Sequence, residues 1–470
     1  MSIRVALLIA VTLALIVYSW RDWFTSLCGL VVLLAFIEHS DMPRKIAGIQ
    51  GVNLPNILLL FVLASWLIQR HGEKLRWDMP RYLNYLMLGY LLVFLVATGR
   101  LLFDLESVSG YYTATRVVCE RLINTVKWVI PGLLIYHGCR TGRRVKMVLV
   151  AICLFHVAIG LQVVLNMPIS GLWDVEVFQM RMRLAGEIGL TPALLGKVFA
   201  GGAWALLAAA ALTRQKRYRV AAFGAFAMLS GTLGLVGSRS AYFAWVVVGG
   251  VMCLLRWHKQ LMLAPIAVVL LFAVLPTVSQ RMGIGFGETD FSGRSVSNMH
   301  LITSGRNVIW PHVIDKISEA PVLGHGRDAM RSTGLTEMLS RNVGEGEAVG
   351  HAHNAYLNLV LEAGVAGLVV VMLFYATLVV LAARLFRQQD PMYVAVGGVA
   401  LAILMGHLAA CIGSQSFWPA EGDIGIWCMI GLLLRMVKVE SEVLNLRRMQ
   451  QQAIRTWRCQ PALGRMVTNG

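Results

Sequence analysis

Charged side chains are scarce in this 470-residue chain. Asp, Glu, Lys and Arg make up 14% of it, whereas hydrophobic residues make up 57%. Apolar stretches long enough to cross a bilayer recur along the chain, so the sequence predicts an all-α polytopic membrane protein. The eight cysteines fall in predicted spans, at span edges or in the basic tail, and they form no disulfide or zinc framework.

Several signatures of other function classes are missing as well. No nucleophile with an adjacent base is evident, which argues against hydrolase chemistry. The glycines between Gly283 and Gly287 have no preceding strand and no P-loop lysine, so they do not form a nucleotide-binding loop. Lys and Arg outnumber Asp and Glu by 42 to 25, but they cluster in short loops between apolar runs. That distribution is typical of the positive-inside rule and not of a nucleic-acid-binding face.

Thirteen apolar segments can be marked as candidate spans. They are 5–20, 23–38, 54–69, 83–102, 118–136, 145–165, 191–212, 220–236, 241–255, 261–278, 355–382, 392–411 and 424–437. The first two are short and are separated only by Arg21 and Asp22, so they can also form one crossing with a re-entrant or interfacial piece. We therefore favour about twelve transmembrane helices with both chain ends in the cytoplasm.

The basic loops predict the orientation. The cytoplasmic loops are 70–81, 140–146, 214–219, 256–259, 384–387 and the tail after Arg435; the external ones are 103–117, 167–190, the turn at Arg239, 279–352 and 412–423. The chain then divides into a transmembrane bundle (1–278), one large periplasmic loop (279–352), further transmembrane helices (353–437) and a basic cytoplasmic tail (438–470). Residues 438–458 are predicted to form a helix along the cytoplasmic headgroups, with a solvated tail as the alternative.

The unusual polar residues of the chain collect in the external loops. They are Arg181, Arg183, Arg239, Arg306, His351 and His353. Arginine near the hydrocarbon boundary is costly unless it is paired or binds an anion. Several arginines that converge from different segments can hold a phosphate or pyrophosphate through their forked donors. The alternative is that each arginine bonds a loop carboxylate or a lipid headgroup.

His353 is the best candidate for a general base. An imidazole titrates near neutrality and can accept a proton from a sugar hydroxyl. The next residue, Asn354, is a good N-cap for the apolar helix that follows, which would fix His353 at the mouth of that helix. A purely structural capping or loop histidine is the alternative.

The helix after His353 has two unusual features. Gly364 and Gly367 give it a small-residue face suited to close helix packing. Asn358 and Glu362 place a polar stripe on it, which should face the protein interior or a wet cavity.

Metal binding is only weakly indicated. His351 and His353 have ligand-like spacing with Glu345 and Glu347 nearby, and Glu288 and Asp290 form an acidic pair. Such pairs are common on solvated loops.

Three motifs in fixed order resemble the domain shared by bacterial O-antigen ligases and O-antigen polymerases. They are SGRNVIW and PVLGHG at 304–326, and HAHN-AYLNLVLEA-GVAG at 351–367, in which His353-Asn354 is followed by Gly364 and Gly367 without a gap. GSRSA around Arg239 is similar to a further family feature, and RLAGEIG at Arg183 to another. The resemblance covers roughly residues 180–370.

The resemblance implies a GT-C-like glycosyltransferase of the Gram-negative inner membrane, with its active site facing the periplasm. It implies a donor O-antigen on undecaprenyl pyrophosphate, lipid A–core oligosaccharide as acceptor, and no metal or cofactor. Carried onto this sequence, His353 is the base, and Arg306 and Arg239 bind the pyrophosphate. Arg183, Asn354, His351 and Trp310 are the expected substrate-binding residues.

Other functions remain open at this point. The motifs do not separate a ligase from an O-antigen polymerase or from an enzyme that transfers glycan to protein. A transporter or flippase would need charged residues near the middle of several spans. Only Glu362, Lys127 and Lys197 fit that requirement.

Overall fold

The structure is a computed structural model of the chain. It describes residues 3–37, 53–166, 183–184, 186–263, 276–283, 288–289, 295–296, 299–343, 350–413, 416–420, 422 and 424–459. Its helices are α1 (Ile3–Ser19), α2 (Trp23–Ile37), α3 (Leu54–Gly72), α4 (Arg81–Phe103), η1 (Leu105–Val108), α5 (Ala114–Arg116), η2 (Val117–Ile123), α6 (Asn124–Val126), α7 (Ile130–Gly138), α8 (Gly142–Asn166), α10 (Pro192–Ala209), η4 (Ala210–Leu212), α11 (Lys216–Val236), α12 (Arg239–Leu255), η5 (His258–Leu263), α14 (Pro276–Gly283), α15 (Met299–Thr303), α16 (Arg306–Glu319), α17 (Ala329–Ser332), α18 (Leu335–Val343), α19 (Ala355–Phe386), α20 (Pro391–Ala410) and α21 (Ile424–Cys459). Strands β1 (Glu288–Thr289) and β2 (Ser295–Val296) pair antiparallel.

The chain is a helical, polytopic membrane protein. Within the described residues, seven helices are long and apolar enough to cross a membrane: α3, α4, α8, α10 with η4, α11, α19 and α20. Helices α1, α2 and α12 are apolar but shorter. Most of the candidate span predicted at 261–278 lies outside the described residues.

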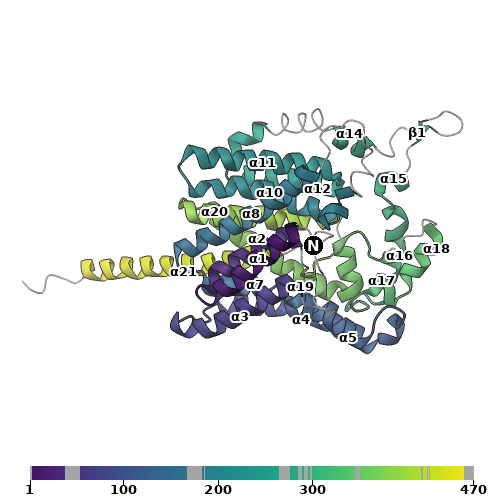
Figure 1. Cartoon of the computed structure of the whole chain (residues 1–470), viewed down its shortest axis with the longest axis horizontal. Helices are drawn as coiled ribbons and strands as arrows, with labels where there is room; N and C mark the ends of the chain where they lie inside the picture. Colours follow the sequence, from purple (N-terminus) through teal and green to yellow (C-terminus); the bar gives the residue numbers. More distant parts are fainter. Residues whose placement is uncertain are drawn as a thin grey trace, which may run out of the picture.

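The long helices run side by side, and the two ends of their bundle differ. Figure 1 shows α16, α17 and α18 at one end, while α21 projects from the other. We call these the α16 end and the α21 end. Helix α20 lies in the middle of the bundle, where α10, α12, α19 and α21 pack around it. Its residues are buried on nearly every side, which fits a helix that is apolar all round.

The first two apolar segments form separate, antiparallel helices. Near the start of α1, Arg4 donates to the Phe36 carbonyl near the end of α2 and to Gln162 near the end of α8, at 3.4 and 3.0 Å. At the other end of α1, Ser19 bonds Ser65 of α3 at 3.0 Å. The chain therefore enters α1 at the α16 end and leaves α21 at the opposite end. The favoured arrangement, with both chain ends on one side, is wrong.

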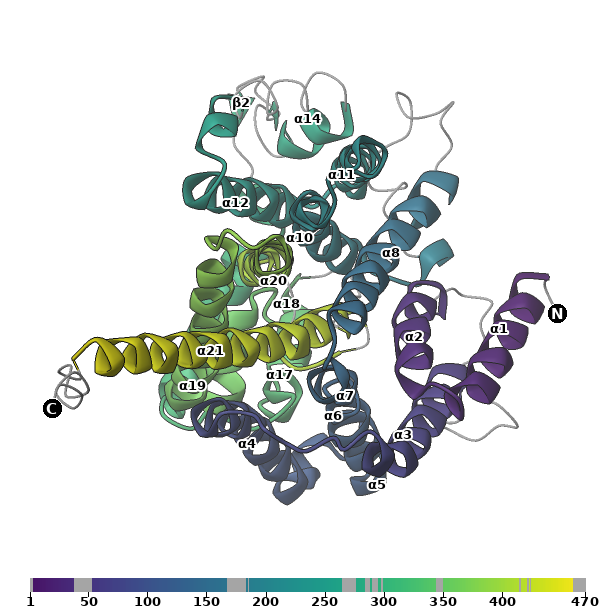
Figure 2. The same cartoon turned by 90° about the vertical axis from the view of Figure 1, so that its left-hand side faces the viewer.

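Helix α21 also differs from its prediction. A helix is present at 438–458 as expected, but it continues the last apolar segment without a break and projects away from the bundle (Figures 1 and 2). Glu440 accepts hydrogen bonds from Arg384 of α19 and from Gln388, two residues past the end of α19, which anchors α21 where it leaves the bundle. A straight continuation of a bundle helix does not lie along the headgroups.

Helix α19 is interrupted at Gly364, and a segment far away in the sequence forms hydrogen bonds with the backbone groups that the interruption leaves unpaired. Gly364 has φ 67° and ψ −176°, a conformation that is essentially restricted to glycine. Residues 321–326, the PVLGHG motif, lie against the break and replace the missing helical hydrogen bonds. The replacements are His325 N to Leu361 O, Gly326 N to Glu362 O, Val365 N to Pro321 O and Ala366 N to Val322 O, at 2.8 to 3.2 Å. The small-residue face was expected to allow close helix packing. At Gly364 the missing side chain instead leaves room for the backbone of residues 321–326.

Replacing Gly364 by alanine is expected to destabilise the protein by about 3 kcal/mol or more, from the strained conformation and the lost hydrogen bonds together. A Cβ at Gly364 would lie 2.1 Å from the Val322 carbonyl oxygen. Thermal unfolding in detergent measures the effect. Gly224→Ala in α11 is the matched control, since nothing lies within 4 Å of a Cβ there and alanine favours a helix. An unchanged melting temperature for Gly364→Ala would contradict the account of the break.

Candidate active site

Three of the predicted site residues meet at the α16 end. Arg239 is the first residue of α12, Arg306 the first of α16, and His353 lies two residues before α19. Arg306 contacts three other segments there. Its Nε donates to the His353 carbonyl at 3.3 Å, its Nη1 to the Thr303 carbonyl at 3.1 Å and its Nη2 to the Gly413 carbonyl at 3.5 Å. A single guanidinium thus joins α15, the residues before α19 and the residues after α20.

Arg239 lies beside Arg306. Its Nη1 donates to the Ile302 carbonyl, which is adjacent in sequence to the Thr303 carbonyl that Arg306 contacts. The next residue, Ser240, also approaches the group, because a Cβ on Gly413 would lie 2.6 Å from the Ser240 Cβ and 3.2 Å from Arg306 Nη2. Arginines from two segments far apart in the sequence therefore lie side by side at the α16 end.

Arg306 carries a positive charge that no described acidic side chain balances. Within the described part of the chain it forms no ion pair, and its hydrogen bonds go to neutral carbonyls. Burial, and then the neighbouring charge of Arg239, lower the pKa of Arg306 below the usual arginine value. The guanidinium has five N–H donors, of which three are used here. The remaining donors and the unbalanced charge favour an anion at this position.

His353 is held in a strained backbone conformation. Its φ is 51°, which few non-glycine residues adopt, although histidine does so more often than most. Asn354 caps α19 as predicted, since its side chain accepts from the backbone N–H groups of Tyr356 and Leu357. Ala355 N donates to the Cys411 carbonyl at 2.9 Å. These contacts therefore fix the backbone directly after His353.

Two more predicted residues complete this arrangement. Trp310 of α16 donates from Nε1 to the Ala352 carbonyl at 3.0 Å, so it supports the backbone just before His353. The His351 and His353 rings lie edge to face with their centres 4.1 Å apart, and His351 Nδ1 accepts from His353 N at 3.3 Å. His351, His353 and Asn354 are all only partly exposed.

The imidazole of His353 is neutral in this environment. Burial lowers the pKa of His353 to about 3, with smaller contributions from His351 and from the positive charge of Arg306. Burial likewise lowers the pKa of His351. A neutral imidazole has one nitrogen that can accept a proton, which is the state that a general base needs.

The pH profile should reflect this shift. A histidine with its ordinary pKa of about 6.5 would lose its neutral form as the pH falls below that value. His353 keeps its neutral form down to about pH 3. If His353 is the base, kcat/KM for transfer should therefore show no acid limb near pH 6.5. Assays between pH 5 and 8, with thermal unfolding at each pH as the control for integrity, measure this. A tenfold loss per unit below pH 6.5 would contradict it.

The other predicted site residues do not contact Arg239, Arg306 or His353 in the described structure. Arg183 is exposed and has no hydrogen bond or ion pair with Arg239, Arg306 or His353 in the described structure. Arg181, Glu345, Glu347 and Asp290 lie outside the described residues, and Glu288 is described only as part of strand β1. Among the described residues, no group of three His, Cys, Asp or Glu side chains is placed to hold a metal.

A buried cluster of charged residues centred on Glu362 of α19 was not predicted from the sequence. Glu362 is buried as expected, but its partners come from segments outside α19. Arg327 Nη1 lies 3.4 Å from its Oε2, Asp328 N donates to its Oε1 at 3.0 Å, and Trp418 Nε1 donates to its Oε2. Asp328 in turn pairs with Arg121 of η2 at 2.6 Å. These contacts hold residues 327–328 against α19 and η2, beside the break in α19. No local pattern marks them.

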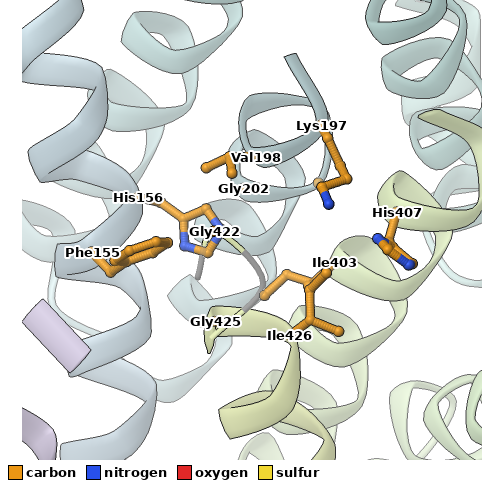
Figure 3. A pocket seen from close by; sticks show the side chains of 11 residues that line it. Phe155, His156, Lys197, Val198, Gly202, Ile403, His407, Gly422, Gly425 and Ile426 are labelled. Atoms are coloured by element: carbon orange, nitrogen blue, oxygen red, sulfur yellow. The ribbon is translucent and has the colours of Figure 1, made fainter. Parts of the chain in front are cut away.

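A small cavity lies among α8, α10, α20 and the start of α21. Figure 3 shows His156, Lys197 and His407 directed toward it from three helices. Its volume is about 20 Å³, enough for roughly one water molecule. An isolated cavity of this size gives no support to a transport pathway.

Comparison with known protein families gives one match. Residues 223–372 match the family model described as O-antigen ligase. The matched stretch contains Arg239, Arg306, His353 and Gly364, whereas Arg183 and helices α1 to α10 lie outside it. No curated protein matches the chain significantly.

Proposed function

We propose, because residues 223–372 match the O-antigen ligase family model, that this chain transfers O-antigen polysaccharide from undecaprenyl pyrophosphate to lipid A–core oligosaccharide. The proposed reaction takes place at the α16 end, on the periplasmic side of the inner membrane. No nucleotide sugar is supplied there, so the donor must arrive already activated and bound to the membrane. The architecture we propose is GT-C-like.

In the proposed reaction an acceptor hydroxyl oxygen attacks the anomeric carbon of the donor glycan. The bond from that carbon to the pyrophosphate oxygen breaks, and the lipid pyrophosphate leaves. The neutral imidazole of His353 takes the hydroxyl proton. Arg306 and Arg239 bind the pyrophosphate and offset the negative charge that develops on the leaving group. Arg183 is proposed to assist at the donor, and His351, Asn354 and Trp310 to line the acceptor side.

One observation carries this proposal: the Arg306 guanidinium lies against the backbone of His353. Its Nε is 3.3 Å from the His353 carbonyl, and its charge has no described acidic partner. An anion bound by Arg306 therefore lies close to the imidazole. This placement suits a glycosyl transfer from a pyrophosphate, because the acceptor oxygen that the base deprotonates attacks the same carbon that the pyrophosphate leaves. The guanidinium charges supply the electrostatic stabilisation in this scheme, so we propose that no metal or cofactor is required. Transfer measured in EDTA tests that part.

A deletion of the gene tests the substrate assignment. A strain without the ligase should accumulate long lipid-linked polymer and show bare core on a lipopolysaccharide gel, with the full-length protein restoring the ladder. Core that carries a single repeat unit would instead identify a polymerase. Loss of glycan from a protein, with normal lipopolysaccharide, would identify a protein glycosyltransferase.

A further inference from the structure

A large groove lies at the α21 end, away from the candidate active site. It is formed by α1, α2 and the first half of α8, and its volume is about 620 Å³. Such a volume is typical of small-molecule binding sites. Figure 2 shows α2 beside α8, with α1 next to α2. The wall is mostly apolar and includes Leu15, Val32, Met147, Val150 and Leu154. Val150 and Leu154 are about half exposed.

The polar part of the groove is almost entirely basic. Arg143 and Lys146, on the first turns of α8, both line it. Neither side chain forms an ion pair in the described structure. The basic residues beside them differ, because Arg140 pairs with Asp78 at 2.7 Å and Arg144 with Glu73 at 2.6 Å. The two cations of this segment that lack an acidic partner are therefore the two that face the groove.

The dimensions of the groove fit one leaflet of a bilayer. Leu154 lies eleven positions after Arg143 on α8, which corresponds to about 16 Å along a helix. The hydrocarbon of one leaflet is about 15 Å thick. The basic end lies level with the polar contacts of Asp78 and Glu73, at the α21 end of the bundle. A headgroup beside Arg143 and Lys146 would thus place its acyl chains along the apolar wall.

We propose that this groove is a binding site for an anionic glycerophospholipid of the leaflet at the α21 end. Its phosphate contacts Arg143 and Lys146, and its acyl chains lie between α1, α2 and α8. Basic pockets between membrane helices commonly bind anionic headgroups. The site is separate from the proposed pyrophosphate site, since Arg306 lies at the other end of the bundle. The proposal depends neither on the transferase reaction nor on the acceptor.

Native mass spectrometry of the full chain in detergent, with phosphatidylglycerol titrated against phosphatidylcholine, tests the proposal. The wild-type protein should retain phosphatidylglycerol preferentially. The double variant Arg143→Gln, Lys146→Gln should bind it roughly thirtyfold more weakly, the effect of two basic residues near a headgroup. The matched control is Lys216→Gln, Arg217→Gln, which removes two cations from a basic segment at the start of α11 that does not line the groove. It should bind like the wild type.

A second variant distinguishes lipid binding in the groove from a non-specific attraction of anionic lipid to basic residues. Val150→Trp narrows the apolar wall and leaves Arg143 and Lys146 in place, so it should also weaken phosphatidylglycerol binding. Equal retention of the two lipids by the wild type, or unchanged binding in the Arg143, Lys146 double variant, would overturn the proposal. Normal binding in Val150→Trp would overturn the placement of the acyl chains. Gel filtration confirms that each variant remains folded.

Discussion

Replacing His353 by asparagine is expected to abolish attachment of O-antigen to core while the protein stays folded and inserted. Asparagine tolerates the left-handed conformation that His353 adopts at φ 51°, so the backbone before α19 should keep its shape. It has no group that can accept a proton near neutral pH. General-base catalysis contributes roughly 10²–10⁴ in rate, and a loss of that size should be measured in a transfer assay with purified lipid-linked donor.

His353→Ala should lose as much activity, but with lower stability, because alanine enters the left-handed region less readily. His312→Ala is the matched control: His312 lies on α16, close in sequence to Arg306, and has no role in the proposed reaction. Activity in His353→Asn within threefold of the wild type would remove His353 as the base. Loss of activity in His353→Ala but not in His353→Asn would mean that His353 maintains the backbone conformation before α19 and does not act as the base.

The convergence of the site residues was predictable from the sequence because it follows from topology. The short basic loops predict an orientation that places Arg239, Arg306 and His353 on one side of the membrane. The start of α19 was predictable too, since the Asn354 cap is a local interaction. Sequence patterns therefore locate these groups at one end of the bundle, but they do not give their contacts.

The features that were missed depend on contacts between distant segments. The break at Gly364 is stable because residues 321–326 supply its hydrogen bonds, and no pattern in either segment reveals that pairing. The position of the chain start was missed because the two short apolar segments at α1 and α2 were favoured as one crossing with a re-entrant or interfacial piece. It is set by Arg4, which bonds Phe36 and Gln162. The direction of α21 was missed because its polar residues were attributed to an interfacial helix, whereas the helix continues straight.

The hydrogen bonds of Arg306 also differ from what the sequence suggests. The sequence suggests a guanidinium whose fork is free for a phosphate. In the structure three of its nitrogens donate to the carbonyls of His353, Thr303 and Gly413. Arg306 therefore has two effects that a substitution can separate: it holds the His353 backbone in place, and it contributes positive charge.

Replacing Arg306 by lysine should lower the transfer rate at least about 10²-fold, the usual cost of removing one fixed donor from a site that stabilises developing charge. Lysine keeps the charge, but its single ammonium cannot contact three carbonyls in different segments. Arg306→Ala should lose more, because the charge is also absent. Steady-state transfer with varied donor concentration measures both: kcat should fall in both variants, while the donor KM should rise mainly in Arg306→Ala.

Arg341→Ala provides the matched control for Arg306, since this exposed arginine of α18 lies at the same end of the bundle (Figure 1) and has no contact with the site in the described structure. It should transfer O-antigen like the wild type. Full activity in Arg306→Lys would mean that a point charge is sufficient and that the three carbonyl contacts are dispensable. Full activity in Arg306→Ala would mean that the pyrophosphate is bound elsewhere. Because His353 and Arg306 share a hydrogen bond, the double variant should lose less than the product of the two single effects.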